Sequence, residues 1–339
     1  MDTFLGAMIL LGFILMLNWW WIKKIIFKVK LKNLEKKRLS SSVNNVYQAI
    51  IDNNYADFSA GLSVLSRSEV YELENCLSNA DKGKDFIKRY ANEHAQKPAA
   101  LYLLGSSLID DAWAARGSGG AGTVNQDQAN QFFNYLQEAE GSLRTLLNIS
   151  PDYVEAYALL IRIQMGLGNM DESWSLYNEA KKIEPGRLDF GLAMLVQLTE
   201  KWGGSHEQMF KFAREEVVAG KPEFSAGLLV AAHYEYWLTL DGKESDRYYK
   251  DKSIKKELLD AIGTIAEIKS DHDFSSRHQK MLAQNCIAFC YLHLNEKKKA
   301  RKVFRAIGEH YTNYPWKYMD DKPAAAYLRF RGLVRAGSV

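Results

Sequence analysis

The sequence has few residues that cross-link or interrupt a chain. Of its 339 residues, three are cysteine and six are proline. Cys76, Cys286 and Cys290 are an odd number in a long chain, so they do not predict a disulfide framework, and a reducing compartment is the simpler interpretation. Because proline is scarce, long uninterrupted helices are expected. With 47% hydrophobic and 25% charged residues, the composition is that of a globular protein.

Most of the chain also lacks an excess of positive charge. The net charge of +3 comes from the stretch between Lys23 and Arg38, where eight Lys or Arg and one Glu give +7. Because Asp2 adds one negative charge, residues 39–339 carry a net charge of −3. This large part of the chain lacks the charge of a nucleic-acid-binding protein, so no nucleic-acid partner is expected.

Catalytic and phosphate-binding motifs are missing as well. The chain has no His-Glu-x-x-His, Gly-x-Ser-x-Gly or paired Cys-x-x-Cys motif. The glycine-rich stretch from Gly117 to Gly122 is not followed by Gly-Lys-Ser/Thr, and it follows a predicted helix instead of a buried strand. We interpret it as a flexible turn and predict no cofactor.

An uncharged run from Thr3 to Ile22 is long enough to cross a hydrocarbon core as one helix. Its end has the composition of an interfacial aromatic belt, and the two lysines that follow are expected to contact lipid headgroups. These interfacial residues are Trp19, Trp20, Trp21, Lys23 and Lys24. The basic segment, residues 23–38, is expected to reinforce the anchor along the inner membrane surface, where each Lys or Arg contributes about 1 kcal/mol.

A cleaved signal peptide is the alternative for this run. It requires a basic region before the apolar residues and a small-residue cleavage site after them, whereas Asp2 precedes the run and three tryptophans end it. We therefore favour an uncleaved anchor. Because the neighbouring Lys and Arg follow the run, the positive-inside rule predicts an external amino terminus and a cytoplasmic carboxy-terminal domain.

The stretch between Pro151 and Pro185 has the 34-residue period of a tetratricopeptide helix pair. The apolar and small positions of that motif are occupied by Tyr157, Leu160, Gly168, Tyr177 and Ala180. Residues that depart from the motif are Ile161, Gln164 and Ser173. The stretch resembles a tetratricopeptide repeat, which implies an all-α, tetratricopeptide-like α-solenoid of stacked antiparallel helix pairs after one transmembrane helix.

Five parts of the chain are predicted on this basis. They are a transmembrane anchor (1–22), a basic juxtamembrane segment (23–42), an amino-terminal helical region (43–96), tetratricopeptide-like repeats (97–320), and a carboxy-terminal capping helix with a tail (321–339). Within the repeats, residues 224–240 and about 247–268 are expected to form one helix pair, and Ser205 with Gln208 predicts a capping box.

Three blocks of sequence indicate a closer resemblance. Residues 112–117, the glycine-rich turn ending at Val124, and residues 201–207 (Lys-Trp-Gly-Gly-Ser-His-Glu) are similar to blocks of a bacterial family catalogued as domain-of-unknown-function family 4034. The resemblance covers about residues 45–318. It implies a bacterial helical-repeat protein, and hence an inner-membrane location for the anchor, but no activity.

Four side chains are candidates for acid–base chemistry: His206, Glu207, His233 and Glu235. If the fold brought them together, Trp202 and Trp237 could supply an apolar wall. The structural alternative, which we favour, places His206 and Glu207 in the first turn of a capped helix, where Glu207 complements the helix dipole.

Cys286, Cys290 and His293 are candidate zinc ligands, because their spacing places them on one helix face. No second ligand cluster is evident, and Cys290 occupies a repeat position that requires a small buried residue. We therefore favour core residues over a metal site.

A protein or peptide in a concave groove is the expected partner, because stacked helix pairs generate such a surface. The candidate contact residues are Arg162, Trp202, Trp237 and Asn285. The basic and amide set that holds a peptide carboxylate in chaperone-binding tetratricopeptide domains is absent, since Ala158 stands where a Lys is needed.

Three functions remain open from the sequence. The first is a membrane-anchored, cytoplasmic protein-binding scaffold or adaptor without catalytic activity. The second is an enzyme that uses the residues around His206 and His233. The third is an immunity or regulatory protein that binds a toxin or an envelope component.

The predicted anchor can be tested by alkaline carbonate extraction of membranes. The full chain should stay in the membrane pellet, because a span of about 20 apolar residues is not released by charge repulsion. A chain lacking residues 1–38 should appear in the wash. Recovery of the full chain in the wash would contradict the prediction.

Overall fold

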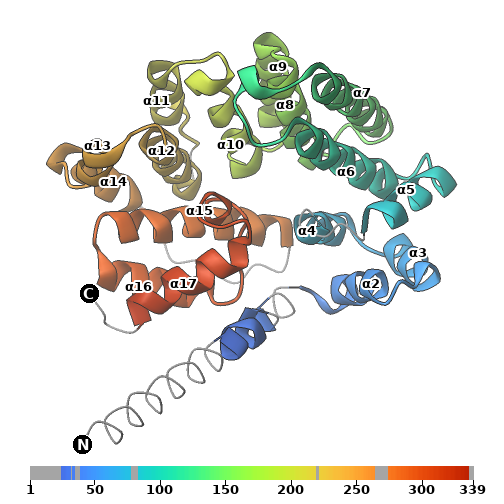
Figure 1. The fold of residues 1–339 in the computed structure, drawn as a ribbon, viewed down its shortest axis with the longest axis horizontal. Coiled ribbons are helices and arrows are strands. Elements are labelled where there is room, and N and C mark those ends of the chain that lie inside the picture. Colours follow the sequence, from blue (N-terminus) through green and yellow to red (C-terminus); the bar gives the residue numbers. More distant parts are fainter. Residues whose placement is uncertain are drawn as a thin grey trace, which may run out of the picture.

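The computed structural model describes residues 24–31, 33–34, 39–77, 83–218, 221–263 and 274–335. The described residues are helical and contain no β-strand, which confirms the predicted all-α class for this part of the chain (Figure 1). The first helices are α2 (Ser41–Ile51), α3 (Tyr55–Ser63), α4 (Arg67–Leu77), α5 (Gly83–Glu93), α6 (Pro98–Arg116) and α7 (Gln126–Ile149). The middle of the chain forms α8 (Glu155–Leu167), α9 (Met170–Ile183), α10 (Leu188–Gln197), α11 (His206–Glu215) and α12 (Pro222–Trp237). The last helices are α13 (Gly242–Tyr248), α14 (Lys252–Gly263), α15 (Phe274–His293), α16 (Lys297–Ile307) and α17 (Pro323–Arg335). Short 3₁₀ turns are η1 (Ala121–Thr123), η2 (Glu200–Trp202) and η3 (Trp316–Tyr318).

The predicted anchor, residues 1–22, lies outside the described residues, as do Trp19, Trp20, Trp21 and Lys23. Within the described ranges, no helix has the length and apolar content that a membrane span requires. Lys24 begins the described part of the basic segment, which is helical through residue 31.

Side-chain caps fix several helix starts. The Asn125 side chain accepts a hydrogen bond from Gln128 N while the Gln128 side chain accepts one from Asn125 N, and this capping box begins α7. At α11, the Ser205 hydroxyl accepts from Gln208 N over 3.1 Å. Gly168 ends α8 with a φ of 73°, a conformation that glycine adopts without strain.

The helix predicted for residues 247–268 is interrupted in the structure. α13 ends at Tyr248 and α14 starts at Lys252. The cause is Asp251, whose carboxylate accepts hydrogen bonds from Ser253 N and Ile254 N. Such a side chain competes with the backbone of a continuing helix and caps a new one instead.

Neighbouring helices along the chain pack against one another, and α15 brings distant parts together. α6 packs on α7, α8 on α9, and α15 on α16, as expected for helix pairs. α15 also packs against α4 and α10, which precede it by long stretches of chain (Figure 1). The Gln279 side chain accepts from Leu188 N and Asp189 N, so α15 caps the start of α10.

The close contact of α10 with α12 depends on two glycines. A Cβ on Gly191 would lie 2.8 Å from the Phe224 ring, and a Cβ on Gly227 would lie 2.8 Å from the Leu188 side chain. Both distances are too short for carbon–carbon contact, so the absence of a side chain sets the spacing of these helices.

The carboxy-terminal helices form a second cluster of buried side chains around Trp316, which is fully buried. Its indole N–H donates to the Asn285 side chain over 2.7 Å. Leu34, at the end of the basic segment, is also buried in this cluster. Leu31 is partly buried against the same cluster, whereas four apolar side chains earlier in that segment are exposed: Ile25, Ile26, Phe27 and Val29.

A buried ionic cluster links α4, α8 and α10. Arg187 is 1% exposed, and its guanidinium contacts Asp189 at 2.7 Å, Glu184 at 3.1 Å and Glu155 at 3.2 Å. Arg67 of α4 contacts the other oxygen of Glu155 at 2.6 Å. Because each buried carboxylate faces a guanidinium, no carboxylate of this cluster is left uncompensated.

Replacing Arg187 should therefore be costly. Arg187→Met leaves Glu155 and Asp189 without their shared cation and should lower the free energy of unfolding by about 3–5 kcal/mol. Arg144→Met is the matched control, because Arg144 contacts Glu140 and Glu172 at the surface and should cost less than about 1 kcal/mol. Denaturant unfolding followed by circular dichroism measures both. Equal losses in the two variants would contradict the assigned role of Arg187.

Candidate functional site

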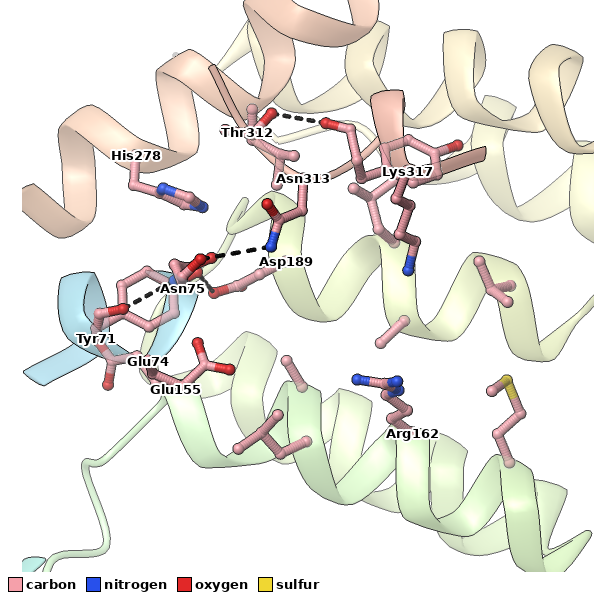
Figure 2. A pocket seen from close by; sticks show the side chains of 18 of the residues that line it. Tyr71, Glu74, Asn75, Glu155, Arg162, Asp189, His278, Thr312, Asn313 and Lys317 are labelled. Carbon is pink, nitrogen blue, oxygen red and sulfur yellow. Dashed lines mark hydrogen bonds between the residues drawn. The ribbon is translucent and has the colours of Figure 1, made fainter. Parts of the chain in front are cut away.

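A cavity of about 360 Å³ lies where α4, α6, α8, α10 and α15 converge. η2 and the segment from Thr312 to Tyr318 complete its wall. Its size is within the range of ligand pockets in proteins. Figure 2 shows carboxylates gathered toward one end and the cations Arg162 and Lys317 at the other.

The acidic end contains Glu74, Glu155 and Asp189. Tyr71 donates its hydroxyl to Asp189 over 3.2 Å, and the Gln279 amide donates to the same carboxylate over 3.0 Å. Burial acts to raise the pKa of Asp189, but the Arg187 guanidinium outweighs it and holds the pKa below its ordinary value. Asp189 is therefore an ionised acceptor at neutral pH.

The cationic end is formed by Arg162 from α8, Lys201 from η2 and Lys317 from η3. Arg162 lies 4.0 Å from Asp110, the limit of an ion pair. The Lys317 side chain is exposed, yet many protein atoms lie around its ammonium. This desolvation, together with repulsion from Arg162, lowers the pKa of Lys317 to about 8.

Glu235 of α12 does not line the cavity but interacts with Lys317. It accepts a hydrogen bond from the Tyr314 hydroxyl over 3.3 Å. Burial raises the pKa of Glu235, although attraction from Lys317 opposes the shift.

Two tryptophans form an aromatic wall beside these charges. Trp113 and Trp202 are edge to face, with 5.3 Å between ring centroids, and Arg116 lies over both rings. The indole N–H of Trp113 is buried and has no acceptor within the described part of the chain. A Cβ on Gly204 would lie 2.2 Å from Leu198 O, so the glycine after Gly203 permits the turn that presents Trp202.

The four acid–base candidates do not form one group. His233 lies 2.7 Å from the Tyr248 hydroxyl and 3.3 Å from Glu257, whereas Glu235, two residues later on α12, contacts Tyr314 near the cavity. Residues two apart on a helix face different sides. Burial lowers the pKa of His233 to about 4, so it is neutral at pH 7.

His206 lies in a separate surface depression, which Glu207 also lines. It contacts Glu200 at 3.4 Å, and its ring packs on Tyr236. The ring of Phe210 packs against both His233 and Tyr236. This arrangement separates the surface histidine from the buried one, with aromatic rings between them.

The candidate zinc ligands lie in the core of the carboxy-terminal half. Cys286 and Cys290 are buried among apolar side chains, and burial raises the pKa of both thiols. The ring of His293 packs against Trp237, Tyr249 and Phe289. Across the described ranges, no cluster of His, Cys, Asp or Glu has the geometry of a metal site.

The structure separates the partner-contact candidates into two groups. Arg162 and Trp202 line the cavity, whereas Trp237 donates to Ser245 O and Asn285 is fully buried against Trp316.

Sequence reasoning did not identify Lys317, Asp189 or His278 as cavity residues. Only the aromatic density from Tyr311 to Tyr318 marked this segment, and no motif distinguishes its lysine.

Two of the three sequence blocks that resemble family 4034 contribute residues to the cavity wall. Trp113 belongs to residues 112–117 and Trp202 to residues 201–207. No model of a known protein family matches the chain. No curated protein matches it either. The resemblance to family 4034 therefore stays a prediction.

The lowered pKa of Lys317 predicts unusual reactivity. At a pH of about 8, roughly half of its amines should be neutral and nucleophilic, whereas a lysine with a pKa near 10.4 is almost entirely protonated. Competitive acylation of the native chain followed by mass spectrometry should show faster labelling of Lys317 than of the exposed Lys256. Equal or slower labelling would contradict the assigned environment.

Proposed function

We propose that this chain is a membrane-tethered helical-repeat protein that binds a peptide segment of a partner in its central cavity. The observation that carries the proposal is the convergence of charged side chains from α4, α8, α10 and η3 on one cavity. Arg67 and Arg187 compensate the carboxylates Glu155 and Asp189 at the acidic end, whereas Arg162 and Lys317 have no such close carboxylate among the described residues. A bound segment with a matching group would compensate these two cations.

The proposed architecture is a tetratricopeptide-like α-solenoid. It is supported by the packing of α6 on α7, α8 on α9 and α15 on α16, and by the buried repeat residues Tyr157, Leu160, Tyr177 and Ala180. In an open solenoid the partner would lie in a long groove. Here α15 also contacts α4 and α10, so the proposed site is a bounded cavity within the stack.

The proposed membrane tether is supported by the basic segment as well as by the apolar run. The exposed residues Ile25, Ile26, Phe27 and Val29 alternate with lysines along a helical stretch. Exposed apolar side chains among lysines suit an interface with anionic lipid. The proposed location is the cytoplasmic face of a bacterial inner membrane, with the amino terminus outside.

The enzyme hypothesis has less support, because His206 and His233 lie in different surroundings and Glu235 faces a third. No observation on the described residues favours the immunity or regulatory hypothesis over a general adaptor. Binding at the cavity is therefore the function that the geometry supports best.

Site-specific photocrosslinking in the native membrane tests this function. A benzophenone side chain at Ala158 or Ala193, which line the cavity from α8 and α10, should crosslink one and the same protein. The control position is Gly141 on the exposed side of α7, where a side chain would meet open space. That position should not give the product.

A cavity-filling substitution provides a second test. Filling the cavity with Ala193→Trp should abolish the product formed from position 158, because the indole occupies the space of the segment. The same products from all three positions, or a product from position 158 that survives Ala193→Trp, would contradict the proposal.

A further inference from the structure

The cationic end of the cavity holds more positive than negative charge. Arg162, Lys201 and Lys317 line this end, whereas the two carboxyl groups that interact with Lys317, those of Asp110 and Glu235, are not part of the lining. With these five groups ionised, one positive charge is left over. Among the described residues, no carboxylate lies within ion-pair distance of the Lys317 ammonium, and Asp110 lies 4.0 Å from Arg162.

The two principal cations belong to opposite walls. Figure 2 shows Arg162 rising from α8 and Lys317 descending from η3, with their nitrogens directed toward one another across the cavity. Like charges that face each other repel unless an anion lies between them. Arg162 contributes to the lowered pKa of Lys317, which is the expected result of such repulsion.

We propose that Arg162 and Lys317 together bind one carboxylate of the peptide segment that occupies the cavity. This inference rests on the proposed function, because it assigns the chemistry of the occupant. A carboxylate has a single negative charge, which equals the excess at this end. Guanidinium and ammonium donors to a carboxylate form strong, charge-assisted hydrogen bonds.

The rest of the cavity gives the occupant a direction. Trp113 and Trp202 lie beside the cations and offer an aromatic wall for the side chain next to the carboxylate. Glu74, Glu155 and Asp189 line the other end, where their negative charges disfavour a second carboxylate. The segment therefore lies with its carboxylate at η3 and away from α4.

The carboxylate has two possible sources in a peptide, the chain terminus and an Asp or Glu side chain. Four probes distinguish them by calorimetric titration of the purified full chain in detergent. They are an N-acetylated tripeptide ending in phenylalanine with a free carboxylate, its amide, the same amide with a central aspartate, and 3-phenylpropionate.

The free acid should bind at least about tenfold more tightly than the plain amide, which corresponds to one charge-assisted contact. Arg162→Gln and Lys317→Met should each lower the affinity for the free acid by about tenfold, so that the acid and the amide bind more nearly alike. The matched controls Arg305→Gln and Lys256→Met change exposed cations outside the cavity and should leave both affinities unchanged.

The pH dependence gives a readout that a purely structural role would not produce. Lys317 is faced by Arg162 from α8, Asp110 from α6, Lys201 from η2, Glu235 from α12, and Tyr318 from its own segment. Because Lys317 loses its proton as the pH rises through about 8, affinity for the acid should fall above that pH. Lys317→Arg should keep the affinity and remove this decline, since arginine stays protonated.

Each outcome decides a separate point. If the aspartate-containing amide binds as tightly as the free acid, the inference stands and a side chain supplies the carboxylate. If 3-phenylpropionate binds as tightly as the tripeptide, the carboxylate site stands and the peptide-binding function fails. Equal binding of the acid and the plain amide, no effect of Lys317→Met and Arg162→Gln, or no binding of any probe at millimolar concentration would overturn the inference.

Discussion

The contact of α15 with the start of α10 is the constraint on which the rest of the structure depends. Gln279 accepts from two free backbone N–H groups of α10 and donates to Asp189, which also binds Arg187. Through Arg187 the same cluster reaches Glu155 of α8, and through Arg67 it reaches α4. Helices that are distant in sequence are thus held around one point. α15 also packs on α12, and this junction fixes α15 against α4 and α10 in the wall of the cavity.

Local features of the sequence account for most helices. Proline spacing, glycine in the turn at Gly168 and the cap at Ser205 each act over a few residues, so one sequence is enough to predict them. The cap at Asn125 is equally local but was not among the predictions. The prediction of one helix over about residues 247–268 was wrong because of another local feature. Asp251 caps a new helix within that stretch. The basic segment is likewise visible in a charge count of the sequence, and its proposed place beside a membrane stays a prediction.

The site was harder to predict, because it is formed by long-range contacts. Arg162 and Trp202 could be named from the repeat pattern and the Trp-Gly-Gly turn, but their common surroundings could not. Lys317 carries no motif, and its environment depends on α6, α8 and α12 surrounding η3. Asn285 and Trp237 were expected to face a partner and instead bind within the protein. Helical periodicity indicates which face of a helix is polar, but not whether solvent or another helix covers it.

The proposed adaptor would hold one protein segment in a cavity whose two ends carry opposite charges. Hydrogen exchange of residues 312–318 tests this account most directly. Those amides should exchange more slowly in chain extracted gently with its native partners than in chain purified to homogeneity, because a bound segment would contact η3. Identical exchange in the two preparations would contradict the claim that the cavity is occupied in the native membrane.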